Sequence, residues 1–149
     1  MIENKLSEAL RKFIGEDLKD YVLPVKTGEA RTPYIVNGYL PPKRSTASDD
    51  FPFVLVRPDH GTSDMGQTEV TVSIIIGCYS EDYDGYEYCL NIMTRIRQAL
   101  ATMENQTLDE RYQLQWPITW ENPTDQPWPQ WQLEMTTKWV FNTPQLTNF

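Results

Sequence analysis

The chain has 149 residues, which is enough for one domain that buries roughly 70% of the surface its unfolded chain would expose. Thirteen basic and twenty-one acidic residues give a net charge of −8. This charge disfavours a protein that grips duplex DNA through its phosphates, although not one that surrounds DNA without holding it. The N-terminus lacks the pattern of a signal peptide and no apolar run approaches a membrane span, so we expect a protein made in the cytoplasm.

One amphipathic helix and a long irregular segment make up the first third of the chain. Apolar residues at helical spacing run from Ile2 to Phe13, and Gly15 predicts that this helix ends near Ile14. Lys26 to Asp50 forms an arm rich in proline, glycine and polar residues. Within the arm, Tyr34 to Leu40 is a candidate for a short edge strand.

Two strands and a second helix follow. Phe51 to Arg57 and Val70 to Ile76 both alternate with the period of a strand, and Ile75 indicates that the second face of the latter is partly covered. Between them, Asp59 to Thr68 is interpreted as a long hairpin loop. The acidic turn Gly77 to Gly85 then leads into a helix whose apolar residues run from Tyr86 to Leu100.

Arg97 interrupts the apolar side of this second helix, because it projects between the directions of Tyr86 and Leu90. A charge in this position needs a carboxylate, a subunit boundary, or a route to water along its own stem. Arg97 is therefore a candidate for a contact with another subunit or partner.

The last third of the chain contains two further strands and no internal repeat. Tyr112 to Trp120 alternates strictly, and Pro117 predicts that this strand lies at an edge or carries a bulge, because proline cannot donate to a ladder. Glu121 to Pro129 is a proline-stiffened connection to a long strand from Trp131 to Phe141, which leads to a short polar tail over residues 143–149.

The predicted order is helix, strand, strand, helix, strand, strand. It favours an α+β fold in a single domain of residues 1–149, with a mostly antiparallel sheet made of two hairpins and covered by two helices. Val70, Val72, Ile74 and Ile76 are expected to pack against Cys89, Met93, Ile96 and Leu100 of the second helix. Cys78 and Cys89, the two cysteines, are interpreted as small buried thiols.

No residue pattern in the chain indicates catalysis. Glu81, Asp82, Asp84 and Glu87 form the densest acidic group, but their spacing matches no EF-hand loop and suits a solvated turn before a helix N-terminus. The segment around His60 holds the residue types of a hydrolytic triad, yet neighbours in one loop do not hold triad geometry. We therefore predict no enzyme activity, no catalytic residue, no metal and no cofactor.

Five tryptophans raise the question of an aromatic binding surface. Trp116, Trp120, Trp131 and Trp139 lie in or beside strand-period segments, where large rings usually belong to the core. Trp128, in the proline-rich connection, is the best candidate for an exposed contact. Lys43 and Arg44 of the arm are further candidates for contacts with subunits or partners.

Several short segments together resemble a family of small phage and prophage proteins. They are FPFVLVRP from Phe51 to Pro58, IGCY from Ile76 to Tyr79, Gly85-Tyr86 with Ile92, Ile96 and Leu100, Trp116-Pro117, Pro127-Trp128-Pro129, and Glu134 to Thr137. The chain from Phe51 to Phe141 thereby resembles the tail terminators and related neck proteins of long-tailed phages. These segments are modest patterns and carry no catalytic signature.

This resemblance implies a virion protein of the tail or neck that is assembled in the cytoplasm of a host bacterium. It implies a subunit that forms a homo-oligomeric ring, commonly a hexamer, on the head-proximal end of the tail tube and presents a surface to the head connector. DNA would pass through such a ring without specific binding, for which an acidic subunit is suitable. The implied partners are the chain itself, the tail tube protein and the connector, with no membrane.

Two alternatives stay open. Another head-tail joining or head completion protein has the same kind of composition and loops, and binding to tail tubes or to connectors would distinguish the two. A small metal-dependent hydrolase that uses the group from Glu81 to Glu87 is the enzyme alternative. A cation-induced shift in melting temperature would reveal it.

Overall fold

The computed structural model describes residues 2–25, 30–39, 51–126 and 128–143, and all statements below refer to these ranges. The elements in chain order are α1 (Ile2–Asp17), β1 (Tyr34–Asn37), β2 (Phe53–Ser63), β3 (Gln67–Tyr79), α2 (Gly85–Ala101), the 3-10 turn η1 (Glu104–Gln106), β4 (Thr107–Leu108), β5 (Tyr112–Glu121) and β6 (Gln130–Asn142). Lys43 and Arg44, most of the arm and residues 144–149 of the tail lie outside the described residues.

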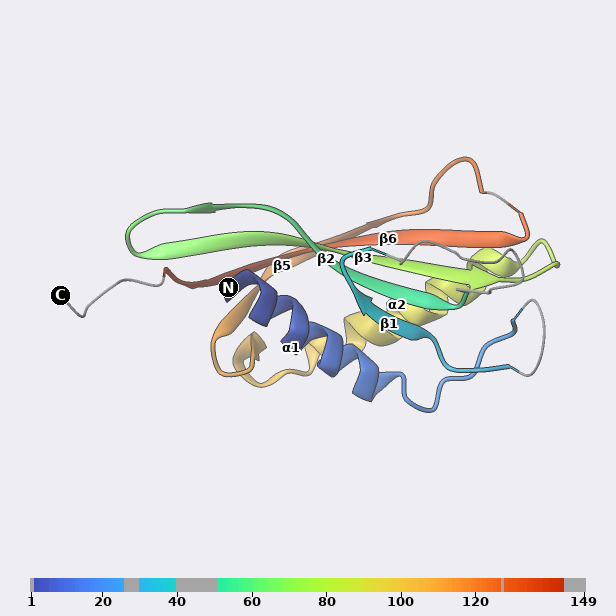
Figure 1. Ribbon diagram of the computed structural model, residues 1–149, viewed down its shortest axis with the longest axis horizontal. Coiled ribbons are helices and arrows are strands. Elements are labelled where there is room, and N and C mark those ends of the chain that lie inside the picture. Colours follow the sequence, from blue (N-terminus) through green and yellow to red (C-terminus); the bar gives the residue numbers. More distant parts are fainter. Residues whose placement is uncertain (1, 26–29, 40–50, 127, 144–149) are drawn as a thin grey trace.

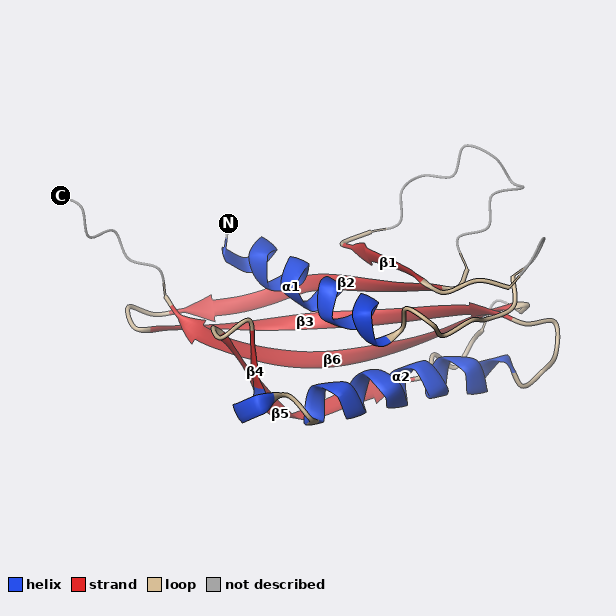
Figure 2. Ribbon diagram, turned by 90° about the horizontal axis from the view of Figure 1, so that it is seen from below, coloured by secondary structure: helices blue, strands red, loops and turns tan. Residues whose placement is uncertain are grey.

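The strands form one sheet in the order β1-β2-β3-β6-β5-β4. β1 runs parallel to β2, and every other neighbouring pair is antiparallel. Both helices lie on the same face of the sheet (Figures 1 and 2), with α1 against β1 and β2 and α2 against β3 and β6. This arrangement confirms an α+β fold with a mostly antiparallel sheet and two covering helices. The candidate edge strand within Tyr34 to Leu40 is present as β1, and β4 adds a short strand that was not predicted at the other edge.

The core lies between the sheet and the helices, where the strand and helix periods had placed it. Ile74 and Ile76 of β3 and Ile96 and Leu100 of α2 are fully or almost fully buried in one hydrophobic cluster. The predicted contact between these two faces is therefore confirmed. One buried face per element is what imposes a period of two on the strand and of 3.6 on the helix.

The other face of the sheet carries a second, smaller apolar cluster of Phe51, Phe53, Leu55 and Tyr79, with Ile75 packed partly against it. This confirms that the second face of β3 is partly covered. Gly77 makes the cluster possible, because a Cβ atom there would lie 2.2 Å from the Phe53 ring. The ring can thus lie close to the backbone of β3.

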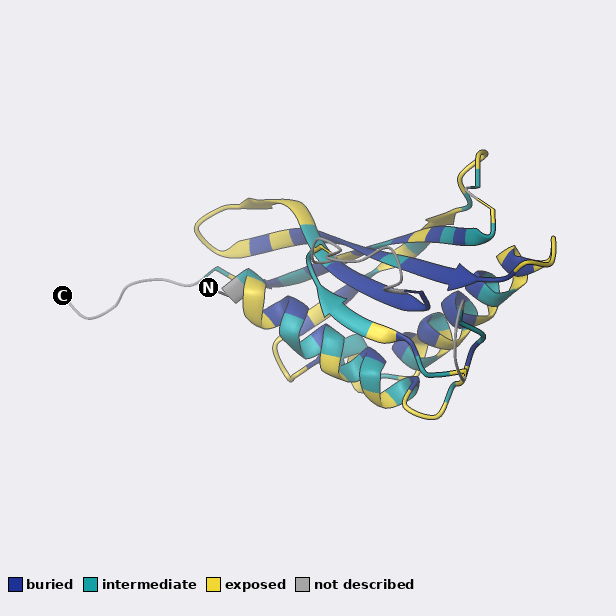
Figure 3. Cartoon of the chain, turned by 45° about the vertical axis from the view of Figure 1, so that its right-hand side comes forward, coloured by how far each residue is buried: buried dark blue, intermediate teal, exposed yellow. Residues whose placement is uncertain are grey.

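The segment Asp59–Thr68 is a two-stranded ribbon and not the long loop that was predicted. β2 continues to Ser63 and β3 begins at Gln67, so only residues 64–66 connect them. Asp64 closes the turn, since its Oδ1 accepts hydrogen bonds from the backbone N–H of Gly66 (2.8 Å) and of Gln67 (2.7 Å). Most of the ribbon is exposed (Figure 3), so neither face imposes the alternation by which a strand is recognised.

The first helix is also longer than predicted, because it runs through Gly15 to Asp17 instead of ending near Ile14. Leu18, directly after it, is buried, and its N–H donates to the carbonyl of Ile14 at 2.9 Å. Burial of Leu18 against the core therefore outweighs the weak helix propensity of glycine, which costs about 1 kcal/mol.

Candidate interaction surface

The tryptophans divide into two groups. Trp131 and Trp139 are buried, as expected for rings on the core face of β6. Trp116, Trp120 and Trp128 remain 48%, 46% and 52% exposed. The prediction of an exposed Trp128 is therefore confirmed, and the assignment of Trp116 and Trp120 to the core is wrong.

The exposure of Trp116 and Trp120 follows from the edge of the sheet. β4 pairs only with Tyr112 and Gln113, so the remainder of β5 has no further strand beside it among the described residues. The register between β5 and β6 also shifts between Gln115 and Thr119, on either side of Pro117, which has no N–H to donate. Both predicted features of this strand, an edge position and an irregular pairing, are thus present.

One flank of α2 lies toward the same edge, because α2 covers β3 and β6 and β5 is the strand next to β6. Tyr86, Leu90 and Arg97 follow one another at helical spacings of four and seven, so they share one side of the helix. Arg95 points the opposite way and donates to the Asp17 carbonyl at the end of α1 (2.9 Å). The flank with Arg97 therefore faces away from α1.

The side chains of Trp116, Ile118 and Trp120 on β5 project from the face of the sheet that the helices cover. Trp120 is opposite Met135, whose side chain lies in the core beneath the helices, and Ile118 packs partly against the same core. Trp116 is held by a hydrogen bond from its indole N–H to Gln106 Oε1 (2.7 Å). We call this surface the aromatic edge, and its members are Tyr86, Leu90, Arg97, Trp116, Ile118 and Trp120.

Arg97 is partly buried within the aromatic edge. Its Nη1 lies 3.8 Å from Met93 Sδ, and the described residues contain no ion pair with it. Within one copy the half-buried Arg97 meets no carboxylate of the described residues, which leaves a route to water along its own stem or a contact with another subunit. Its guanidinium thus keeps donors that a carboxylate of another molecule can use.

A second exposed group lies at one end of the sheet. We call Glu81 to Asp84, together with Trp128, the acidic tip. Trp128 donates its indole N–H to the Glu81 carbonyl (3.0 Å), and its ring stacks with that of Tyr83 at a centroid distance of 6.4 Å. Arg97 lies much farther along α2, about 16 Å beyond Tyr86, so the two predicted contact residues belong to different places.

Asp59, His60 and Ser63 line one pocket of about 250 Å³ on the ribbon, but Asp59 and Ser63 hydrogen-bond to Ser73 and Thr68 and not to His60. His60 is exposed on β2, and Asp64 is engaged in the hairpin turn. Within the described ranges, no group of three or more His, Cys, Asp or Glu side chains is placed to hold a metal ion. Cys78 and Cys89 are free buried thiols, and a hydrogen bond with Cys89, together with burial, raises the pKa of Cys78 far above its ordinary value.

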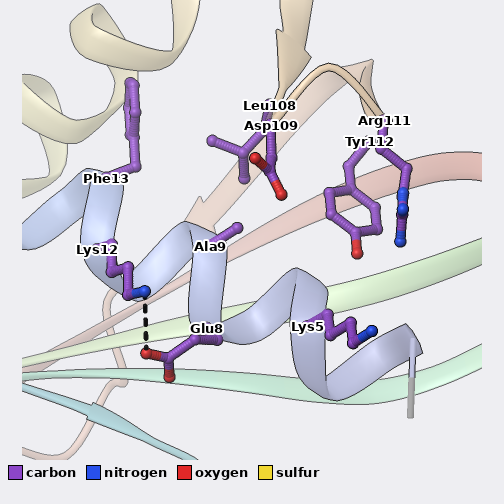
Figure 4. A pocket seen from close by; sticks show the side chains of 9 residues that line it. All are labelled: Lys5, Glu8, Ala9, Lys12, Phe13, Leu108, Asp109, Arg111 and Tyr112. Carbon is purple, nitrogen blue, oxygen red and sulfur yellow. Dashed lines mark ion pairs between the residues drawn. The ribbon is translucent and has the colours of Figure 1, made fainter.

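A concavity beside α1 was not expected from the sequence. It is a groove of about 650 Å³ between α1 and the turn that joins β4 to β5 (Figure 4). We call it the basic groove, and its lining residues are Lys5, Glu8, Ala9, Lys12, Phe13, Leu108, Asp109, Arg111 and Tyr112. Its two walls are about a hundred residues apart in the chain, so no local pattern could have indicated it.

No family model matches the sequence, and a search of curated proteins found no match. Among the described helices, none combines the length and the apolar character that crossing a bilayer requires. The functional proposal therefore rests on the surfaces described above and on the resemblance of the short segments.

Proposed function

We propose that this chain is a structural protein of phage morphogenesis, a tail terminator that forms a ring at the head-proximal end of the tail tube and joins it to the head connector. The observation that carries the proposal is the aromatic edge. Aromatic residues and arginine are the residue types that are enriched at the centres of protein interfaces. The short segments that resemble those of tail terminators support this kind of assembly.

Two further features support an assembly subunit. The β2–β3 ribbon extends the sheet as an exposed hairpin (Figure 3). Such a hairpin can lie on a neighbouring molecule while the core stays intact. The net charge of −8 suits a wall along which DNA slides, since few cations are present to hold its phosphates.

The aromatic edge also suits another head-tail joining protein, for which the connector would be the main partner. The two functions differ in the surface that is recognised. A tail terminator binds the end of the polymerising tube, whereas a head completion protein binds connectors and leaves tubes uncapped.

The test is to add the purified protein to polymerising tail tubes and to image their ends by electron microscopy. The wild-type protein is expected to cap the ends and limit tube length, while the double variant Trp116→Ala, Trp120→Ala loses capping. Tyr34→Ala is the matched control, because Tyr34 is an aromatic residue of similar exposure (51%) on β1, at the opposite edge of the sheet.

Circular dichroism must show that the double variant keeps the native fold. Uncapped tubes with the wild-type protein would contradict the tail-terminator function. Equal capping by the wild-type protein and the double variant would show that the aromatic edge does not contact the tube.

A further inference from the structure

The basic groove and the acidic tip have complementary chemistry. The groove has an apolar floor that includes Phe13 and Leu108, and cations of Lys5, Lys12 and Arg111 around it. In Figure 4 the Lys5 and Arg111 side chains lie on the same side of the opening. The chain as a whole has a net charge of −8, whereas three cations gather around this one cavity.

The acids that line the groove only partly offset these cations. Two of the partners of Glu8 lie outside the groove, since Arg11 Nη2 donates to its Oε1 (2.5 Å) and Asn37 Nδ2 to its Oε2 (2.9 Å). Its third partner is Lys12 of the groove, whose Nζ lies 3.9 Å from the same Oε1 (Figure 4). The hydrogen bond from Arg11 lowers the pKa of Glu8. Asp109, on the β4–β5 turn, is the other lining acid. Three lining cations and two lining acids leave the groove with a surplus of one positive charge.

The acidic tip carries the opposite arrangement. Tyr83 is 82% exposed and stands between two exposed carboxylates, Asp82 and Asp84. Its ring is supported by Trp128, and the turn beneath it is held by hydrogen bonds from the Ser80 N–H to the Pro129 carbonyl (2.9 Å) and from the Asp82 N–H to Ser80 Oγ (3.1 Å). The tip is thus a preformed aromatic knob flanked by negative charges, which reduces the entropy lost on binding.

The two features lie at opposite ends of the sheet. The tip follows Tyr79, which pairs with Gln130 at the start of β6, whereas the groove wall adjoins Gln113, which pairs with Val140 near its end. Ten residues of strand separate these pairs, a distance of about 33 Å. One copy therefore cannot insert its tip into its own groove.

We infer that the acidic tip of one copy binds in the basic groove of a second copy, with Tyr83 on the apolar floor and Asp82 and Asp84 beside the cations. The groove volume of about 650 Å³ accommodates a tyrosine side chain with its two neighbours, within the roughly 300–1,000 Å³ of ordinary binding pockets. Because the two surfaces differ, the contact is heterologous and repeats from copy to copy until a ring closes. The inference rests on the proposed ring and names the contact that builds it.

Charge reversal tests this contact. The tip variant is Asp82→Lys with Asp84→Lys, the groove variant is Lys5→Glu with Arg111→Glu, and a third protein carries all four substitutions. Self-association is measured by sedimentation velocity over a range of concentrations and salt. Each double variant is expected to weaken association by roughly tenfold or more, and the fourfold variant to restore it, because opposite charges then face each other again.

Two controls isolate the contact from general charge effects. Lys138→Glu and Asp20→Lys change exposed charges outside both surfaces and should leave association unchanged. Carbodiimide, which joins amines to carboxylates in contact, should link Lys5 or Lys12 to Asp82 or Asp84 between copies, both in solution and on capped tubes.

The outcomes separate this inference from the proposed function. Absence of the cross-link both in solution and on tubes, wild-type association of both double variants, or failure of the fourfold variant to recover would overturn the tip-to-groove contact. A protein that still caps tubes in these cases keeps its proposed function. Conversely, one outcome is that the fourfold variant recovers association while the wild-type protein caps no tubes. This result would establish the contact and contradict the tail-terminator function.

Discussion

Two adjacent isoleucines of β3 provide the sharpest test of which face of the sheet is the core. Ile74 is 0% exposed and lies between Val56 of β2 and Met135 of β6, on the face covered by the helices. Ile75 lies on the opposite face and is only half-buried beside the smaller cluster. Truncating each to alanine removes the same atoms from the same strand, so strand propensity largely cancels in the comparison.

The expected losses differ because the burial differs. Ile74→Ala should reduce the free energy of unfolding by about 4 kcal/mol, toward the upper part of the 2–5 kcal/mol range, since strands and helices leave little room for collapse around the cavity. Ile75→Ala removes a side chain that is already partly hydrated, so we expect about 1–2 kcal/mol. At roughly 2–4 °C per kcal/mol for a domain of this size, melting temperatures should fall by about 8–16 °C and 2–8 °C.

Urea unfolding followed by circular dichroism gives both free energies, and an unchanged m-value would show that the same two-state transition is being compared. Ala101→Gly would be a poor control because it changes helix propensity, whereas the two isoleucine variants control for each other. Equal losses, or a larger loss for Ile75→Ala, would refute the assignment of the helix-covered face as the main core.

Three other expectations follow from local contacts. Gly85→Ala should lower the melting temperature and perturb indole fluorescence, because the new methyl group would lie 2.2 Å from Trp131 Nε1; an unchanged melting temperature would contradict this contact. Cys78 and Cys89 should resist a thiol reagent at pH 8 until the protein unfolds, since both are buried and the pKa of Cys78 is raised; rapid labelling of the folded protein would disprove their burial. Asp64→Ala should destabilise the ribbon above pH 4, and the difference should vanish as the pH falls through the folded pKa of Asp64, which two backbone N–H groups hold below 3.8; a difference independent of pH, measured by urea unfolding, would exclude the charged carboxylate as its cause.

The elements recognised from the sequence are those with one buried and one wet face. In β3 and α2 the contrast between the two faces produces a period, and the residues of the core could be named from it. The same reasoning failed for the ribbon at Asp59–Ser63, where both faces are exposed, and for the end of α1, where Leu18 is buried beyond a glycine. Burial of Leu18 in the core outweighed the local signal of the glycine, whereas the ribbon pairs locally and has no buried face to produce a period.

Trp116 and Trp120 show the same limit on the surface. Their alternation continues that of Tyr112 and Leu114, which are buried, so the residue pattern is identical on both sides of the point where cover ends. Whether these side chains are covered depends on how far β4 extends along β5 and on the path of α2. Neither feature can be recognised from the residues near the two tryptophans.

The sequence by itself determined the kinds of element, the inward faces of β3, α2 and β6, the irregular pairing near Pro117 and the exposure of Trp128, because each depends on residues close together in the chain. Only the tertiary structure decided that β6 lies between β3 and β5, that the sheet ends in an aromatic edge, and that the basic groove and acidic tip stand at opposite ends. The physical reason is that strand pairing and helix docking join segments far apart in the chain, and their geometry leaves no local period in the sequence.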